Sequence, residues 1–267
     1  MPIKSSSQTV VFKDNSYIFV KKLYPMNVKI LAAILLNTLV IFHSCASGPA
    51  NSEPDVVAAI LSGETTLDIS SFKWTREPKS FSIENGTIEV VTNPGTDLWQ
   101  RTYYHFRNDN APVFQMTTAE KYFSFIVKTD FTDSHHRFDQ CGVVMYLDSE
   151  NWLKGSVEYE NENFQHLGSV ATNAGYSDWA TTAIPADVKS MWYRFSRRAD
   201  DYCIECSTDG ETFSQMRVCH MHAADETISF GIYACSPEDS SFKAVFSDMQ
   251  ITECAWKAHD GQQPDED

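Results

Sequence analysis

The chain has 267 residues, of which 42% are hydrophobic and 13% aromatic, so it has ample material for a packed core and is not a disordered protein. Its formal net charge is −15, from 21 basic and 36 acidic residues, which repels phosphate backbones and argues against nucleic acid as a partner. Nothing in the sequence demands a metal or a cofactor. No EF-hand loop occurs, although calcium binding stays an open alternative because carboxylates are its preferred ligands.

The first 65 residues divide into three segments. Residues 1–25 show no clear period and are interpreted as a mis-called start, with Met26 as the true start, or as disordered. Residues 26–45 predict a secretory signal peptide, because Lys29 precedes an apolar run over 30–42 that is shorter than the ~20 residues of a membrane span. Residues 46–65 are interpreted as a polar tether that includes a short helix-compatible run.

Cys45 follows the apolar run and resembles the acylated cysteine of a bacterial lipoprotein. The residues before it fit that motif only in part, since Phe42 and His43 depart from it and Ser44 agrees. Cleavage by an ordinary signal peptidase near Ala46 and an uncleaved anchor are the alternatives. We therefore expect an exported protein, either a lipoprotein of the bacterial cell envelope or a periplasmic or secreted protein, that contacts a membrane only through this anchor.

Strand patterns recur every ten to fifteen residues in the rest of the chain, with turn sequences such as Asn85-Gly86 and Asp209-Gly210 between them. They predict one all-β domain over 66–256, an antiparallel sandwich or jelly roll, followed by an acidic disordered tail over 257–267. The strands are expected at 80–83, 87–91, 122–129, 141–147, 152–160, 165–172, 192–198, 202–207, 213–218, 228–234 and 244–251.

The stretch over 139–158 predicts a β-hairpin whose second strand has an aromatic and charged face. Because side chains alternate along a strand, Trp152, Lys154 and Glu158 share one face, whereas Leu153 and Val157 share the other. A buried Lys or Glu needs a partner or loses its charge. This face is therefore expected to look at solvent, a groove or a ligand.

Six cysteines follow Cys45, an even number that would permit disulfide bonds in an exported protein, with a pairing that the sequence does not determine. Cys203 and Cys206 form a CxxC motif within a predicted strand, where residues three apart face opposite sides. Buried thiols are therefore favoured over a zinc or redox site. The six are Cys141, Cys203, Cys206, Cys219, Cys235 and Cys254.

Seven short motifs stand in a fixed order over roughly 67–254: Thr96–Trp99, Phe138–Gly142, Asn151–Glu158, Ser177–Trp179, Ser207–Gly210, Arg217 and Gly231–Pro237. Together they resemble an uncharacterised concanavalin A-like family, a domain of unknown function that carries the regulation-of-enolase label. The resemblance implies a jelly-roll sandwich of two curved antiparallel sheets, similar to those of lectins and glucanases. It implies little about chemistry.

A ligand surface is predicted where aromatic and charged side chains meet. If the strand over 192–198 lies in the same sheet as 152–158, Arg194 converges with Trp152, Lys154 and Glu158 on one concave surface. Such a cluster suits sugars, because an aromatic ring stacks on the C–H face of a pyranose and charged groups bond its hydroxyls. The alternative is a cross-strand salt bridge from Glu158 to Lys154 or Arg194 that only holds the sheet together.

Two predicted loops add aspartate and tryptophan pairs, Asp97 with Trp99 and Asp178 with Trp179. Such pairs are typical of binding rims, although the aspartates could instead make turn hydrogen bonds while the rings cover the core. We favour the core for Trp99 and the rim for Trp179. The ligand-binding candidates are Trp152, Lys154, Glu158, Arg194, Asp97, Gln140, Asp178 and Trp179.

Carbohydrate binding on the concave sheet, with a glycan as partner, is the favoured function. A glycoside hydrolase or lyase is the first alternative, with Glu158, Asp139 and Asp178 as the acids; it is less favoured because the acids near Glu158 do not show the familiar glucanase spacing. Hydrolysis requires two carboxyl groups about 5 Å apart for retention, or ~6.5–9.5 Å apart for inversion. A non-catalytic structural or protein-binding surface module is the second alternative.

Overall fold

The computed structural model describes residues 9–14, 17–22, 54–103 and 105–257. The chain forms two compact units, Met1–Ser52 and Glu53–Asp267. In the first unit, β1 (Thr9–Asp14) and β2 (Tyr17–Lys22) pair as an antiparallel hairpin. The predicted signal peptide, Cys45 and nearly all of the predicted acidic tail lie outside the described residues.

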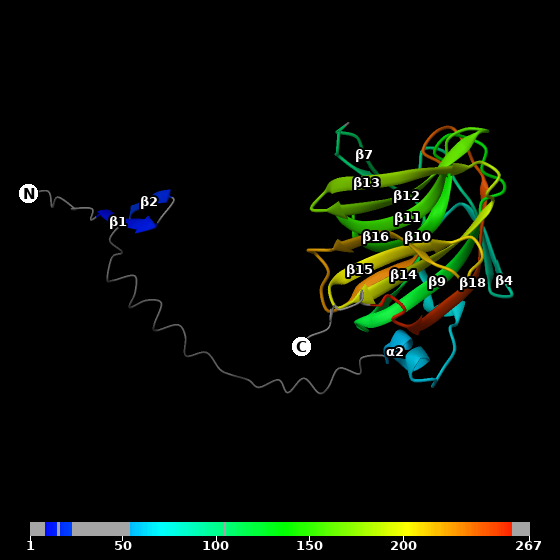
Figure 1. The fold of residues 1–267 in the computed structure, drawn as a ribbon, viewed down its shortest axis with the longest axis horizontal. Helices are drawn as coiled ribbons and strands as arrows, with labels where there is room; N and C mark the ends of the chain where they lie inside the picture. Colours follow the sequence, from blue (N-terminus) through cyan, green and yellow to red (C-terminus); the bar gives the residue numbers. More distant parts are fainter. Residues whose placement is uncertain (1–8, 15–16, 23–53, 104, 258–267) are drawn as a thin grey trace, which may run out of the picture. The chain divides into compact units, whose positions relative to one another are not determined.

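The second unit is a sandwich of two seven-stranded antiparallel sheets, which Figure 1 shows as two layers. Sheet I has the order β13-β12-β11-β10-β17-β8-β3, and sheet II the order β16-β15-β14-β9-β18-β5-β4. The chain crosses repeatedly between the layers, since β10 to β13 lie in sheet I, β14 to β16 in sheet II, β17 in sheet I and β18 in sheet II. This architecture is the predicted all-β, concanavalin A-like jelly roll.

The strands of sheet I are β3 (Lys73–Arg76), β8 (Val113–Thr118), β10 (Gln140–Asp148), β11 (Asn151–Tyr159), β12 (Phe164–Asn173), β13 (Tyr176–Pro185) and β17 (Ile228–Cys235). Those of sheet II are β4 (Ser80–Glu84), β5 (Thr87–Val91), β9 (Tyr122–Asp130), β14 (Ser190–Arg198), β15 (Asp201–Ser207), β16 (Ser214–His220) and β18 (Lys243–Glu253). A further hairpin pairs β6 (Leu98–Gln100) with β7 (Arg107–Asp109).

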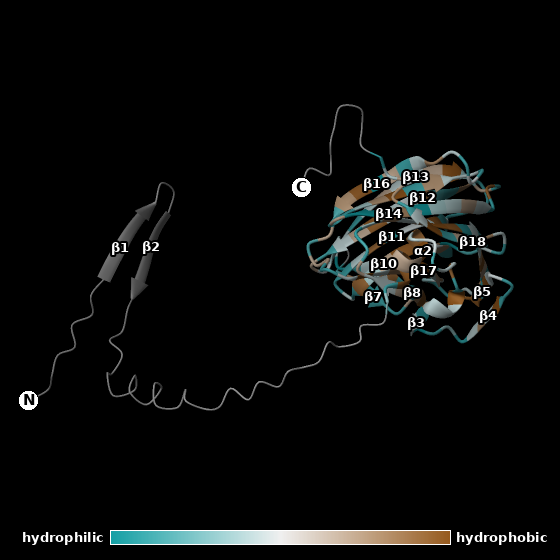
Figure 2. Cartoon of the chain, turned by 90° about the horizontal axis from the view of Figure 1, so that it is seen from below, coloured by the Kyte–Doolittle hydropathy of each residue, from teal (hydrophilic) through white to brown (hydrophobic). Residues whose placement is uncertain are grey.

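The main core lies between the two sheets, where alternate residues of each strand meet. Leu153 and Val157 of β11 point into it, as do aromatic residues of sheet II. Phe230 of β17 contacts Phe123 and Phe125 of β9, with ring centroids 4.7 and 5.3 Å apart. Figure 2 shows hydrophobic and hydrophilic residues intermixed along the strands of both sheets.

Helix α2 (Val56–Leu61) belongs to the sandwich rather than to a tether. Val57 is fully buried in the main core, and the helix lies beside β18 (Figure 1). Asp55 caps the helix and also accepts hydrogen bonds from Thr118 Oγ1 and the Ala119 N–H. The predicted tether over 46–65 is therefore wrong in its second part, because burial of an apolar side chain fixes this segment to the fold.

Seven strands were not predicted from the sequence: β1 and β2, which lie in the segment over 1–25 that was interpreted as a mis-called start or as disordered, and β3, β6, β7, β8 and β13. The largest of these errors is β13, because Ser177–Trp179 were expected in a loop but form part of this strand. β13 lies at the edge of sheet I, where most of its side chains are exposed on both faces. An edge strand of this kind lacks the alternation of apolar and polar residues on which strand prediction depends.

Five of the cysteines are free thiols: Cys141, Cys203, Cys206, Cys219 and Cys235. Burial raises the pKa of the Cys203 thiol to about 12 and that of the Cys219 thiol to about 11. Such thiols stay protonated at neutral pH and are poor nucleophiles. Within the described part of the chain, no helix is long and apolar enough to cross a membrane.

Candidate functional site

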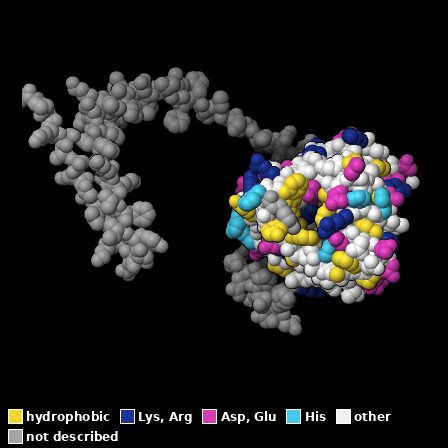
Figure 3. Space-filling view, turned by 90° about the horizontal axis from the view of Figure 1, so that it is seen from above, with side chains coloured by type: hydrophobic (Ala, Val, Ile, Leu, Met, Phe, Trp, Pro, Cys, Tyr) yellow, Lys and Arg dark blue, Asp and Glu magenta, His cyan; other side chains and the backbone are white. Residues whose placement is uncertain are grey.

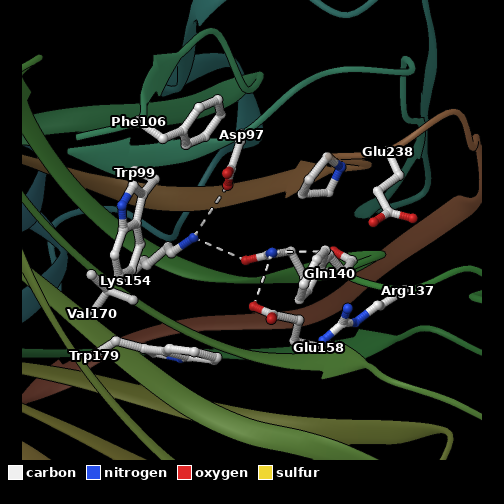
Figure 4. Close-up of a pocket in the computed structure, with 12 residues that line it drawn as sticks. Asp97, Trp99, Phe106, Arg137, Gln140, Lys154, Glu158, Val170, Trp179 and Glu238 are labelled. Atoms are coloured by element: carbon white, nitrogen blue, oxygen red, sulfur yellow. Dashed lines mark hydrogen bonds and ion pairs between the residues drawn. The ribbon is translucent and has the colours of Figure 1, made fainter. Parts of the chain in front are cut away.

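A pocket of about 460 Å³ opens on the outer face of sheet I, the face turned away from the main core. This volume is within the range of small-ligand sites. Figure 3 shows a hollow in this side of the molecule with hydrophobic and charged side chains around it. The pocket is lined by Asp97, Trp99, Phe106, Arg137, Phe138, Gln140, Lys154, Glu158, Val170, Trp179, Pro237 and Glu238 (Figure 4).

The floor of the pocket comes from the hairpin β10–β11. Its register places Gln140 opposite Glu158 and Val144 opposite Lys154. Because Leu153 and Val157 face the main core, Lys154 and Glu158 point outward, as the alternation predicted. Two ionisable side chains are therefore held on the outer face of a central strand.

Gln140 connects these two side chains (Figure 4). Its Oε1 accepts hydrogen bonds from Lys154 Nζ at 3.0 Å and Tyr233 Oη at 2.8 Å, and its Nε2 donates to the Phe138 carbonyl and to Glu158 Oε2, both at 3.1 Å. Lysine can only donate, so the orientation of the amide is determined. With four bonds made, Gln140 positions Lys154 and Glu158 rather than offering atoms to a ligand.

Lys154 is almost fully buried, and its charge is balanced within the protein. Besides its bond to Gln140, Nζ lies 3.9 Å from Asp97 Oδ1 and 5.3 Å from the centre of the Tyr233 ring. Both a carboxylate and the face of a ring stabilise a nearby cation. Burial in turn raises the pKa of Asp97, an effect that the charge of Lys154 opposes.

Glu158 has the most perturbed carboxyl group of the pocket. Glu158 is only 9% exposed, and burial raises its pKa to about 7. The charges of Lys154 and Arg137 lower that pKa, whereas those of Asp97 and Glu160 raise it. Oε2 accepts the bond from Gln140, whereas Oε1 accepts no hydrogen bond from the described residues. One oxygen of a carboxyl group that titrates near neutrality is therefore available in the pocket.

Aromatic side chains form the walls. Trp179 of β13 is 42% exposed, and its ring meets that of Trp99 edge to face, with centroids 6.2 Å apart. Phe106 and Phe138 lie on other sides of the pocket. Trp179 thus lies at the opening of this pocket, whereas Trp99, which was expected in the core, is half-buried and faces both the pocket and a small apolar cluster.

That cluster buries Trp152. The hairpin β6–β7 covers part of the outer face of sheet I, and Leu98 packs there with Val144, Val170 and Trp152, which is 0% exposed. The prediction that Trp152 stacks on a ligand is therefore wrong. The alternation of side chains assigned Trp152 to the outer face of the strand correctly. It could not show that β6, about fifty residues earlier in the chain, covers Trp152 on that face.

Two further predicted residues lie away from the pocket. Arg194 is on β14, which belongs to sheet II, and its guanidinium pairs with Glu205 through bonds of 2.6 and 2.7 Å. Asp178 points to the opposite side of β13 from Trp179 and pairs with Arg217 of β16 at 3.0 Å. Their placement in the ligand surface is wrong, because one is on the other sheet and the other is on the wrong face of its strand.

Asp139 is a structural residue. It is 1% exposed and accepts hydrogen bonds from the backbone N–H groups of His135 and His136 and from the hydroxyls of Ser236 and Ser240. These four bonds tie two loops together and occupy the carboxylate. The prediction of Asp139 and Asp178 as acids acting with Glu158 is therefore wrong; the carboxyl group that faces Glu158 across Lys154 and Gln140 is that of Asp97 (Figure 4).

Several lining residues were not selected from the sequence. Phe138 and Pro237 stood within the family motifs without an assigned role, and Arg137 and Glu238 directly adjoin those motifs. Phe106 had no such signal. As for metals, no group of three or more His, Cys, Asp and Glu side chains suited to hold an ion occurs among the described residues.

Comparison with known proteins places the chain in a sequence family. The model of the family described as "Protein of unknown function (DUF1349)" matches residues 74–254. The chain is 29% identical over 195 residues to "Regulation of enolase protein 1" of Saccharomyces cerevisiae, covering 72% of this chain and 96% of that protein. A crystal structure of a functionally unknown protein from the same yeast has a TM-score of 0.64 and 28% identity, covering 70% of this chain and 98% of that chain.

More distant structural similarity extends to glycoside hydrolases. A xylan β-1,4-xylosidase from Bacillus halodurans C-125 has a TM-score of 0.53 and 14% identity over 71% of this chain. The GH43 protein BlXynB of Bacillus licheniformis has a TM-score of 0.53 and 19% identity over 72% of this chain. The chain spans only 38% of each of these two proteins, and at such identity the similarity concerns the fold.

Proposed function

We propose that this chain, which belongs to the DUF1349 family, binds carbohydrate in the pocket of sheet I. The observation that carries the proposal is the pairing of exposed aromatic walls with a polar floor whose groups are held in place. Trp179 offers a ring face for the C–H groups of a pyranose, and Glu158 Oε1 offers a hydrogen-bond partner for a hydroxyl. The same sandwich architecture occurs within proteins that include a xylan β-1,4-xylosidase, which agrees with a polysaccharide ligand.

The proposal is tested by screening the purified protein on a glycan array. Replacing Trp179 by Ala is expected to abolish binding, or weaken it at least about tenfold, because loss of the stacking surface for the sugar should cost about 1.4 kcal/mol or more. Thermal stability should change little, since Trp179 is 42% exposed and lies on an edge strand outside the main core. Tyr122→Ala is the matched control, because Tyr122 is an aromatic residue of sheet II with a similar exposure of 38%. Unchanged binding by Trp179→Ala would exclude this site.

A glycoside hydrolase or lyase is the second candidate, and the pKa of about 7 for Glu158 favours it, because general acids and bases work best near the ambient pH. Asp97 is the carboxyl group that would act with it. Incubating each glycan that binds with the protein and analysing products by mass spectrometry separates the candidates, since a binding module releases none. A structural or protein-binding module, the third candidate, gains if no glycan binds.

We also propose that the chain is exported and that Cys45 carries a lipid anchor. The support is the order of Lys29, the apolar run over 30–42 and Cys45 in the sequence. The folded unit with its pocket would then be displayed outside the cytoplasm, where polysaccharides are met.

A further inference from the structure

We infer that the pocket selects a glycan that carries an ammonium group, an amino sugar, over neutral sugars and uronic acids. This inference rests on the carbohydrate-binding proposal and gives it a substrate class. It follows from the charges of the lining residues and from Glu158, a buried carboxyl group whose Oε1 accepts no hydrogen bond among the described residues.

Both cations of the pocket are already engaged by the protein. Lys154 is bound by Gln140 and lies near Asp97. The Arg137 guanidinium pairs with Glu160 at 3.0 Å and lies 4.4 Å from the centre of the Phe138 ring. A uronic acid would bring a further carboxylate to a pocket whose three acids, Asp97, Glu158 and Glu238, already outnumber its two cations, so acidic glycans are disfavoured.

The acids are not all engaged. Asp97 faces Lys154, whereas Glu238 has only His136 Nδ1 at 3.3 Å, which carries a charge only when the ring is protonated, and the Glu238 side chain is half-exposed to water. Glu158 is different, because it is buried, receives one bond from an uncharged amide and forms no ion pair among the described residues. An ammonium group near Oε1 would supply the missing positive charge, and hydrogen bonds between charged groups are about twice as strong as neutral ones.

The aromatic walls suit the same ligand. Trp99, Phe106, Phe138 and Trp179 surround the pocket, and the faces of such rings attract cations. Burial raises the pKa of Glu158 to about 7, so its ionised form is disfavoured despite the nearby charges of Lys154 and Arg137. A cationic ligand would favour that ionised form, so its binding should displace a proton from Glu158 at mildly acidic pH.

The test compares trisaccharides of glucosamine, glucose and galacturonic acid by isothermal titration calorimetry at pH 6.5. Glucosamine is expected to bind at least about tenfold more tightly than glucose, and galacturonic acid more weakly than both. Titration in two buffers of different ionisation enthalpy should show release of roughly half a proton or more per glucosamine ligand, and less for glucose. The proton release is measured on the wild-type protein alone.

Glu158→Gln should bring the ratio of glucosamine to glucose affinity close to one and abolish the proton release. Glu211→Gln is the charge-matched control, because Glu211 lies in the exposed turn after β15, outside the pocket. If Glu211→Gln lowers the ratio equally, the preference comes from the overall negative charge and the inference is wrong. Equal or tighter binding of glucose or galacturonic acid overturns the inference and leaves the proposed function standing, whereas failure of all sugars overturns the proposed function as well.

Discussion

At the scale of single residues, the molecule keeps a carboxyl group in a place where its ionisation is unfavourable. Glu158 lies on a central strand, largely removed from water, and its bond from Gln140 is available to the protonated and the ionised group alike. The pKa rises from an ordinary 4.5 to about 7, which corresponds to about 3 kcal/mol. Unfavourable ionisation of this kind is more common at functional sites than elsewhere.

This raised pKa makes a prediction about stability. Below pH 4.5 Glu158 is protonated in the folded and unfolded chain alike; between pH 4.5 and 7 the unfolded chain loses its proton first, so the contribution of Glu158 to stability falls as pH rises. In urea unfolding, Glu158→Gln should therefore match the wild type near pH 4.5 and exceed it by up to about 3 kcal/mol at pH 8. Glu211→Gln is the control for the loss of one exposed carboxyl group. A constant difference between Glu158→Gln and wild type at both pH values would contradict the raised pKa.

The polar residues of the site were partly predictable, because alternation along one strand decides which side chains share a face. Lys154 and Glu158 followed from that rule alone. Trp152 obeyed the same rule and was still misassigned, since its burial depends on a hairpin distant in sequence. Arg194 was misassigned for a related reason: its own strand was predicted, but which sheet the strand joins depends on long-range pairing.

At the scale of elements, the short helix α2 closes the sandwich at β18. Asp55 does more than cap this helix, because the same carboxylate accepts hydrogen bonds from Thr118 and from the Ala119 N–H at the end of β8. Asp68 caps the 3₁₀ turn over Ile69–Ser71 with one local bond to the Ser70 N–H. Asp55 thus joins two elements that are distant in sequence, whereas Asp68 only caps its own turn, so the two residues can be compared.

The prediction for this element compares Asp55→Ala with Asp68→Ala. Loss of an N-cap costs about 0.5–2 kcal/mol, and Asp55→Ala also leaves the partners at Thr118 and Ala119 without their acceptor. We expect Asp55→Ala to lower the free energy of unfolding by about 2 kcal/mol or more, and Asp68→Ala by less than about 1 kcal/mol. Denaturant unfolding at pH 7 measures both. Equal losses would show that α2 is capped locally and does not hold β8.

At the scale of the whole molecule, the number and spacing of strand patterns were enough to identify an antiparallel sandwich, and the family motifs specified its jelly-roll type. The position of the pocket required the three-dimensional arrangement. β6 and β7 are three residues each, too short to be recognised by alternation, and yet this hairpin covers one part of sheet I and leaves the part beside it open. The pocket is therefore a product of topology rather than of any one motif.

The last prediction concerns where the whole molecule resides. If Cys45 is acylated, its acyl chains supply the membrane affinity, at about 0.8 kcal/mol per buried CH₂ group. Removing the cysteine should then remove that affinity without changing the folded unit. When the protein is expressed in a bacterium, the wild type should sediment with membranes and enter the detergent phase, whereas Cys45→Ser should move to the soluble fraction. The melting temperature of this variant should be unchanged, because Cys45 precedes the folded unit that begins at Glu53. Ser47→Ala is the control and should stay with the membranes. If Cys45→Ser remains in the detergent phase, an uncleaved apolar anchor replaces the lipid, and mass spectrometry of the N-terminus would distinguish the two by the presence of residues 30–42.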